Sequence, residues 1–290
     1  MAESLVALHR PSPWHSFRAG MWLGWQIESN WADPWVFTIY AVLRPVSLAG
    51  ILVVMYAAIT RGAFDSPVFT SMYLGNAFYI YVGAITSGMG WAVVQDREHY
   101  RTLKSIYAAP VMVPYYLIGR GVAGLVTASF SVIVILTLGV MVLGLGIGPG
   151  TVEWPLLAAG LGFGVMALAF MGLAVAGIML LTGSESWALG ALLAGALYLF
   201  SGAVFPLDVL PSALRPIGLV LPVTYWLEVI RRALIPGDRG ASALAAWTDE
   251  GVLALLAALT ATTAIGAMTL FRVCERRARQ RGLIDRTSNY

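Results

Sequence analysis

Long apolar runs constrain this chain more strongly than any other feature of its sequence. The run LLAAGLGFGVMALAFMGLAVAGIMLL (156–181) contains no charged residue, and comparable runs recur along most of the chain. About 20 helical residues are enough to cross the hydrocarbon core of a bilayer. Strands of a membrane barrel would alternate apolar and polar residues, which this run does not do. The sequence therefore predicts an all-α integral membrane protein.

The composition supports the same prediction and argues against soluble enzymes. Of 290 residues, 59% are hydrophobic and 11% are charged, whereas soluble domains carry roughly a quarter of charged residues. The single cysteine, Cys274, allows no internal disulfide and no multi-cysteine metal site. His9, His15 and His99 lie far apart in the sequence. We therefore expect this chain to bind no metal and no cofactor of its own.

The apolar runs divide the chain into six predicted spans. These are about Trp35–Thr60, Val68–Val94, Met112–Gly148, Pro155–Leu181, Ser186–Pro206 and Glu250–Phe271. We expect one transmembrane domain over 1–290, in which 35–271 form the six-helix bundle. The tryptophan-rich segment 1–34 is predicted to hold a helix at headgroup depth, and 272–290 form a basic tail.

The distribution of arginine and lysine predicts the orientation, because these residues concentrate on the cytoplasmic side. Basic residues gather in three segments that six spans would place on one side: 1–34, 96–104 and 272–290. We therefore expect both termini in the cytoplasm of a bacterial cell, as a multi-pass protein of its cytoplasmic membrane. The segment 201–239 also carries arginines on the opposite side, so it is not expected to be a simple loop.

A charged segment interrupts the apolar pattern between the second and third predicted spans. No charged residue occurs in 66–95, and the residues Asp96, Arg97, Glu98, His99, Arg101 and Lys104 then follow within nine positions. Arg97, Arg101 and Lys104 have the spacing of one helix face, and Tyr100, Leu103 and Tyr107 form a neighbouring stripe. Two interpretations stay open: an interfacial helix whose charges face water and lipid headgroups, or a docking helix that a soluble partner binds.

The segment 201–236 combines frequent proline with high apolarity. Five prolines fall within it, and proline disrupts helix interiors. Non-helical backbone at membrane depth is tolerated only inside protein or around a watery cavity. A re-entrant pair of short helices at the external face satisfies both constraints, and a surface helix capping the bundle is the alternative. Glu228 is placed to pair with Arg231 or Arg232.

Three motifs resemble those of ABC-2 type transporter permeases, the membrane subunits of one class of ABC exporters. The first consists of Glu98, Thr102, Leu103 and Pro110, with Arg101 where the family often has glycine. The second is the most specific and consists of Ser201, Gly202, Phe205, Pro206, Leu210, Pro211, Leu221, Pro222, Tyr225, Glu228 and Arg231. The third, ESNWADPWVFTIYAVLRPV (28–46), is similar to the elbow helix that leads into the first span of the family.

The resemblance implies an exporter subunit that works with other chains. It implies a cytoplasmic coupling helix made of Asp96, Arg97, Glu98, His99, Tyr100, Arg101, Thr102 and Leu103. It implies an external gate that includes Phe205, Pro206, Pro211, Pro222, Tyr225, Glu228 and Arg231. A phosphate loop needs GxxxxGK[ST], and the only lysine, Lys104, follows Leu103. ATP and magnesium are therefore expected on two copies of a separate nucleotide-binding subunit, beside a second permease chain.

The substrate path is expected to be lined by polar and aromatic side chains, because the spans contain few charges. The candidates are Tyr73, Asn76, Tyr79, Thr86, Ser87, Tyr198, Phe200 and Ser201. Arg120, early in the third span, is expected to reach the membrane interface. The scarcity of intramembrane carboxylates argues against a proton- or sodium-coupled carrier. Such a wall suits an amphiphilic drug, lipid or glycan, with membrane lipids as neighbours and no nucleic acid partner.

Two other classes of function stay open. An intramembrane protease of the rhomboid kind would need a GxSG serine and a histidine within a span, and the sequence has neither. A lipid phosphotransferase would need clustered aspartates near a span end, and the aspartates are scattered. A membrane scaffold without transport would have no effect on the ATP hydrolysis of a partner. We expect no catalytic residues and no ATPase activity on this chain.

Overall fold

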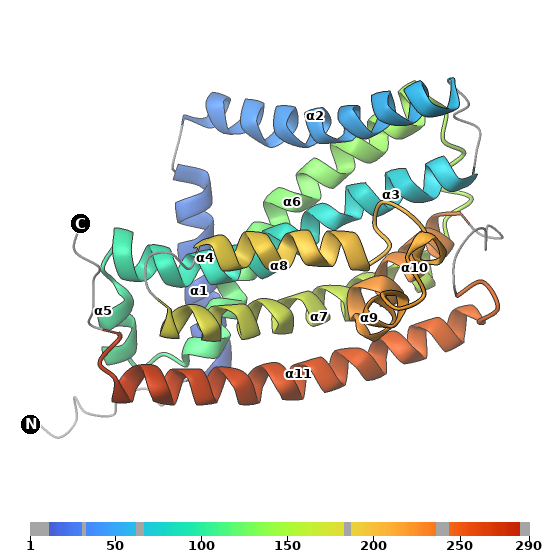
Figure 1. Cartoon of the computed structure of the whole chain (residues 1–290). Coiled ribbons are helices and arrows are strands. Elements are labelled where there is room, and N and C mark those ends of the chain that lie inside the picture. Colours follow the sequence, from blue (N-terminus) through green and yellow to red (C-terminus); the bar gives the residue numbers. More distant parts are fainter. Residues whose placement is uncertain (1–11, 31–32, 62–66, 183–186, 236–243, 285–290) are drawn as a thin grey trace, which may run out of the picture.

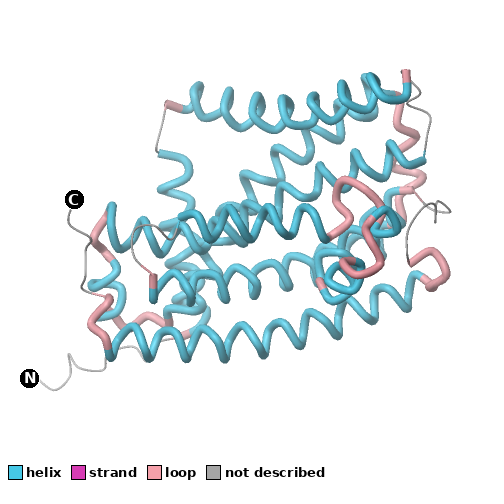
Figure 2. Tube along the Cα trace, viewed as in Figure 1, coloured by secondary structure: helices cyan, strands magenta, loops and turns pink. Residues whose placement is uncertain are grey.

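The computed structural model describes residues 12–30, 33–61, 67–182, 187–235 and 244–284. These parts of the chain are helical and contain no strand (Figure 2). The helices up to residue 108 are α1 (Pro13–Asn30), α2 (Pro34–Thr60), α3 (Pro67–Val82), η2 (Gly83–Ser87), α4 (Gly88–Val94), η3 (Gln95–His99) and α5 (Leu103–Ala108). They are followed by α6 (Val113–Leu143), α7 (Trp154–Leu181), α8 (Trp187–Phe200), η5 (Leu207–Val209), α9 (Arg215–Val220), α10 (Pro222–Leu234) and α11 (Asp249–Gln280).

Four of these helices are long and apolar enough to cross a membrane. They are Pro67–His99, which joins α3 to η3 without a break, together with α6, α7 and α11. The prediction of a helical membrane protein is confirmed at this level. The first and fifth predicted spans correspond to α2, which has 27 residues, and α8, which has 14. Their role as spans stays a prediction.

The structure corrects the end of the fifth predicted span. The helix ends at Phe200 rather than at Pro206, and the chain turns through 201–205. Gly202 lies in the left-handed region with φ of 72°, a conformation that glycine adopts without a Cβ penalty. The backbone carbonyl of Gly202 accepts a hydrogen bond from Arg231 at 2.6 Å. The turn is therefore fixed by α10, which the apolar pattern of the span does not reveal.

The helix ends follow from their local sequence. Proline occupies the first turn of α2, α6, α7 and α10, where its missing N–H costs no helical hydrogen bond. Thr248 caps α11 by accepting a hydrogen bond from the backbone N–H of Gly251. Asp249 and Glu250 follow in the first turn, where their negative charges interact favourably with the positive end of the helix dipole.

The long helices lie side by side, and the short ones lie at the two ends (Figure 1). α7 packs against α4, α10 and α11, and α6 packs against α1 and α3. α1 runs across the direction of the long helices, at the end where α5 also lies (Figure 1). We call this the basic end, because the arginine-rich last turns of α11 are there. α9 and α10 lie toward the opposite end (Figure 1).

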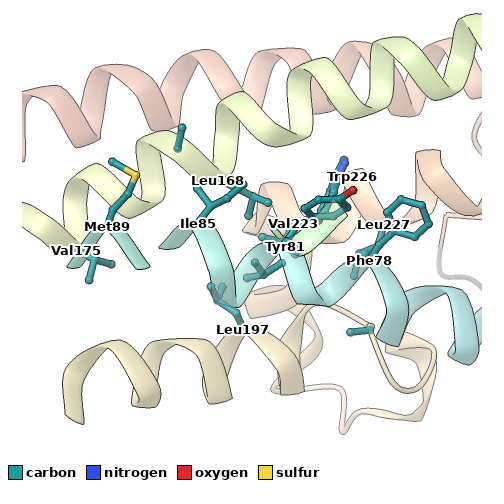
Figure 3. Packing of buried hydrophobic residues seen from close by; sticks show 14 of the residues in the cluster. Phe78, Tyr81, Ile85, Met89, Leu168, Val175, Leu197, Val223, Trp226 and Leu227 are labelled. Atoms are coloured by element: carbon teal, nitrogen blue, oxygen red, sulfur yellow. The ribbon is translucent and has the colours of Figure 1, made fainter. Parts of the chain in front are cut away.

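A buried aromatic cluster lies where α3, α7 and α10 meet. The indole of Trp226 is completely buried and meets the rings of Phe78 and Tyr81 at centroid distances of 6.4 and 6.2 Å (Figure 3). A Cβ at Gly164 on α7 would overlap this indole. Glycine at this position therefore lets α10 seat its tryptophan directly on the backbone of α7.

Candidate functional site

The charged segment after the second predicted span does not form the single helix that the spacing of its charges predicts. Gln95–His99 form the last, π-helical turn of the long helix, and α5 begins only at Leu103. Arg101 lies between them in the left-handed region with φ of 54°. The backbone N–H of Thr102 donates to the carbonyl of Asp96 at 2.8 Å. The prediction of one helix face shared by Arg97, Arg101 and Lys104 is therefore wrong.

Asp96 belongs to a buried ion pair instead of a solvent-facing patch. Its side chain accepts from Arg120 at 3.0 Å and from the Tyr116 hydroxyl at 2.9 Å, both on α6. Arg120 also donates to Gln95 at 3.3 Å. Asp96 is 1% exposed and Arg120 is 8% exposed. The expectation that Arg120 reaches the membrane interface is wrong, because a buried carboxylate on the neighbouring helix neutralises it.

Arg97 joins the same turn to α7. It donates to the carbonyl of Met179, near the end of α7, at 3.2 Å and to Glu98 at 2.8 Å. Its Nη2 is buried and has no hydrogen-bond partner among the described residues. Asp96 and Arg97 together therefore fix this turn to two long helices, α6 and α7.

The remaining residues of the predicted coupling segment separate into buried and exposed groups. Leu103 is buried in the core, and Glu98 and Thr102 are half-buried. His99, Tyr100 and Arg101 are exposed. The segment thus has a rigid base and an exposed turn that precedes α5.

α5 also contacts the last turns of α11. The guanidinium of Arg279 lies over the ring of Tyr107 at 4.8 Å from its centroid. Burial, and then the charge of Glu275, raises the pKa of the Tyr107 hydroxyl, which therefore stays protonated at neutral pH. The C-terminal end of α5 is thus held against the C-terminal end of α11.

α1 lies against α6 through small residues. Ser16, Gly20 and Gly24 are the buried residues of α1, spaced four apart on one face. The backbone N–H of Met112 donates to the Ser16 hydroxyl at 2.9 Å. Large aromatic side chains, Trp14 and Trp22, are exposed on the remainder of α1. This arrangement suits a helix at the membrane interface.

Gly20→Ala is expected to displace α1 from α6. A Cβ at this position would overlap the carbonyl oxygen of Tyr116, so we expect a loss of about 1–3 kcal/mol of unfolding free energy from overpacking. The measurement is the melting temperature in detergent. Gly50→Ala in α2 is the control, because a Cβ there meets nothing within 4 Å. Equal melting temperatures for the two variants would contradict the close packing of α1.

The predicted path-lining residues separate into two groups. One group lies at the contact between the long helix Pro67–His99 and α8. It consists of Asn76, Tyr79, Ser87 and Tyr198. The Tyr198 hydroxyl donates to Asn76 at 2.8 Å, Ser87 donates to the carbonyl of Gly190 at 3.1 Å, and Tyr79 donates to the carbonyl of Ala194. We call these four residues the α8 seam.

The other four candidates lie away from these contacts. The Tyr73 hydroxyl donates to the carbonyl of Ile135 on α6 at 2.7 Å. Thr86 bonds within its own helix, to the carbonyl of Val82. Phe200 ends α8, and the buried hydroxyl of Ser201 has no hydrogen-bond partner in the described structure. The structure therefore brings half of the predicted lining residues together.

The predicted gate segment consists of two short helices held by arginine. Phe205 and Pro206 are half-buried, Pro211 is exposed, and Pro222 begins the buried helix α10. The Tyr225 hydroxyl donates to the carbonyl of Leu219 at 2.7 Å, which joins α10 to α9. Pro236 lies outside the described residues.

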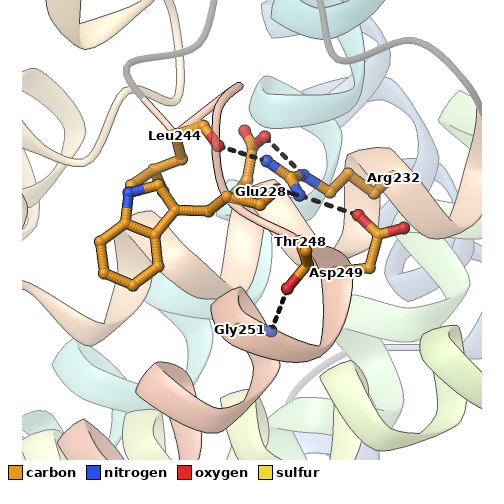
Figure 4. A network of polar contacts seen from close by, with 7 residues as sticks. Glu228, Arg232, Leu244, Thr248, Asp249 and Gly251 are labelled. Carbon is orange, nitrogen blue, oxygen red and sulfur yellow. Dashed lines mark hydrogen bonds and ion pairs between the residues drawn. The ribbon is translucent and has the colours of Figure 1, made fainter.

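Arg231 and Arg232 of α10 fix different neighbours. Arg231 donates to backbone carbonyls of Ser71, Gly202 and Ala203. Arg232 pairs with Glu228 and with Asp249, both at 2.8 Å (Figure 4). The predicted pairing of Glu228 with one of these arginines is confirmed for Arg232.

Several residues that make these polar contacts or the aromatic packing of the core are missing from the sequence predictions. They are Gln95, Tyr116, Trp226 and Asp249, and Arg120 and Arg232 have more partners than expected. Their partners are distant along the chain, as the separation of Asp96 from Arg120 shows. The available signal is the rule that a charge within an apolar span needs a partner.

No protein-family model matches the chain, and no curated protein matches it. The resemblance to ABC-2 type permeases therefore depends on the three motifs alone.

Proposed function

We propose that this chain is the permease subunit of an ATP-driven exporter of the ABC-2 type. The observation that carries the proposal is the construction of the segment 96–108. Its short helix α5 lies at the basic end (Figure 1), and the exposed turn at Tyr100 and Arg101 comes just before α5 in the chain. Its base is held by the buried pair of Asp96 and Arg120. A segment built in this way can receive force from a soluble partner without deforming.

The contacts of this segment give a route for such a force. Movement of α5 reaches α6 through Asp96 and Arg120, and reaches α7 through Arg97 and the carbonyl of Met179. Closure of two ATPase subunits beneath the membrane would then move these helices as rigid bodies between inward and outward states. ATP and magnesium are bound by those subunits.

The proposal includes six spans, with α2 and α8 added to the four long helices. α2 has 27 helical residues, which is enough for the hydrocarbon core. α8 has 14 and would complete its crossing together with the re-entrant turn, α9 and α10. The basic end and both termini then lie in the cytoplasm, and α1 is the elbow helix at the interface.

The α8 seam supports a path for an amphiphilic drug, lipid or glycan between two permease chains. The seam joins α8 to the long helix Pro67–His99 by three hydrogen bonds from side-chain hydroxyls. Each typically contributes only about 1 kcal/mol net. Opening it is therefore inexpensive, and it would expose hydroxyl and aromatic groups together with the apolar wall.

The test is co-purification of ATPase activity with the full chain from native membranes. Arg101→Glu should lower the co-purifying activity by about tenfold, equivalent to roughly 1.4 kcal/mol of binding free energy. Arg61→Glu is the matched control, because Arg61 and Arg101 are both exposed and both have φ of 54°, but Arg61 lies at the opposite end. Tyr100→Ala should weaken binding through loss of an exposed aromatic anchor.

The control separates docking from misfolding. If both charge reversals lose the ATPase equally, the loss reflects folding rather than docking. If the wild-type chain brings down no ATPase, the exporter proposal fails and a membrane scaffold becomes the better interpretation.

A further inference from the structure

We propose that Arg272 and Arg276 form a binding site for the phosphate group of an anionic phospholipid on the outward face of α11. The inference depends on the membrane-spanning character of α11 and not on the proposed transport function. It follows from the face that the two arginines occupy, their depth and the absence of a protein partner among the described residues.

The face of α11 is defined by its burial pattern. Phe271, Cys274 and Ala278 are buried and face the bundle. Ile265 and Thr269 are exposed, and Arg272 and Arg276 are exposed after them. These exposed residues are separated by four, three and four positions, the spacing of one helix face. The arginines therefore continue the surface that Ile265, which is 68% exposed, presents to lipid.

The depth follows from the charge-free length of the helix. Between Glu250 and Arg272, residues 251–271 carry no charge, and at 1.5 Å per residue they span about 31 Å. The hydrocarbon core is about 30 Å thick. Arg272 therefore lies where acyl chains give way to headgroups, and Arg276 lies one turn, or about 6 Å, further out.

Arg279, three residues after Arg276, differs from the two proposed lipid-binding arginines because its guanidinium contacts other protein side chains. Arg279 pairs with Glu275 at 2.9 Å and lies over Tyr107. In the described part of the chain, neither Arg272 nor Arg276 has an ion pair. Arginines on adjacent turns of a helix have Cβ atoms about 5–6 Å apart. Their two guanidinium groups can therefore donate together to the oxygens of one phosphate.

A lipid fits this site better than a soluble protein does. Ile265 lies on the same face as the arginines, and Val273 lies three positions before Arg276. Both are exposed apolar residues, 68% and 46% exposed. A water-soluble partner would leave these side chains in lipid and would have to reach arginines at the headgroup boundary. A phospholipid covers both parts at once, with its acyl chains on the apolar residues and its phosphate on the arginines.

The test is a lipid titration of the full chain in detergent, followed by native mass spectrometry. Wild-type protein should bind phosphatidylglycerol more tightly than zwitterionic phosphatidylcholine. Arg272→Gln/Arg276→Gln should weaken the first phosphatidylglycerol adduct by roughly fivefold for each arginine lost. Binding of phosphatidylcholine should not change.

Arg277→Gln/Arg281→Gln is the matched control. It removes the same charge from the same end of α11, and Arg277 is rotated by about 100° from Arg276. We expect this variant to bind phosphatidylglycerol within about twofold of the wild type, because Arg272 and Arg276 are unchanged in it.

Three results would overturn the proposal. Equal losses in the two double variants would show a diffuse charge effect. Displacement of the lipid by inorganic phosphate at similar concentration would show a site for the free anion. Unchanged lipid binding in Arg272→Gln/Arg276→Gln, with loss of a co-purifying ATPase, would show a protein-docking surface.

Discussion

Arg120→Met is expected to lower the free energy of unfolding by about 3–5 kcal/mol, because Asp96 would stay buried without its cation. Asp96 is 1% exposed, and its remaining described side-chain contact would be the Tyr116 hydroxyl. A neutral hydrogen bond does not compensate the desolvation of a carboxylate. The loss is measurable as a large drop in melting temperature in detergent, followed by the fraction of monodisperse protein after heating.

A double variant distinguishes the uncompensated charge from lost packing. Asp96→Asn/Arg120→Met removes both charges and should recover part of the stability lost in the single variant, because coupled residues are not additive. Arg215→Met is the control, because its ion pair with Asp208 has both side chains exposed and such pairs are worth about 0–1 kcal/mol. Similar melting temperatures for Arg120→Met and Arg215→Met would show that the buried pair does not stabilise the fold.

The long helices could be predicted from the sequence because hydrophobic length alone determines them. The predicted spans Pro155–Leu181 and Val68–Val94 agree closely with α7 and with the helix Pro67–His99. The prolines of 201–236 also predicted correctly that this apolar segment is broken into short helices. Both signals are local, since a bilayer and a proline ring act on the residues next to them.

The polar contacts could not be predicted, because they join residues that are distant along the chain. The charge pattern of 96–104 is helical in period, yet burial of Asp96 against α6 bends the chain at Arg101 and breaks that period. Likewise, nothing local shows that Gly164 receives Trp226, or that Tyr73 faces α6 rather than the α8 seam. These choices are tertiary, and they decide which predicted residues lie together.

The second large effect is expected at the opposite end of the molecule, in the network around Arg232. Its guanidinium donates to Glu228 and Asp249, and also to the backbone carbonyls of Leu244 and Trp247, at 2.7–2.8 Å (Figure 4). Arg232→Leu would leave the Glu228 carboxylate buried without its cation and would free two carbonyls. We expect a loss of about 3–5 kcal/mol, and the separation of residues 244–248 from α10.

Melting temperature and limited proteolysis within 244–248 measure the two consequences separately. Arg215→Leu is the matched control, since Arg215 pairs with Asp208 at 3.3 Å while both side chains are well exposed, and such pairs contribute about 0–1 kcal/mol. Glu228→Leu/Arg232→Leu should be more stable than Arg232→Leu alone, because no buried charge stays unpaired. If instead Arg232→Leu melts like Arg215→Leu and gains no cleavage, Arg232 does not hold α10 to the start of α11. The segment 201–234 would then be anchored by Arg231 and by the packing of Trp226 on Gly164.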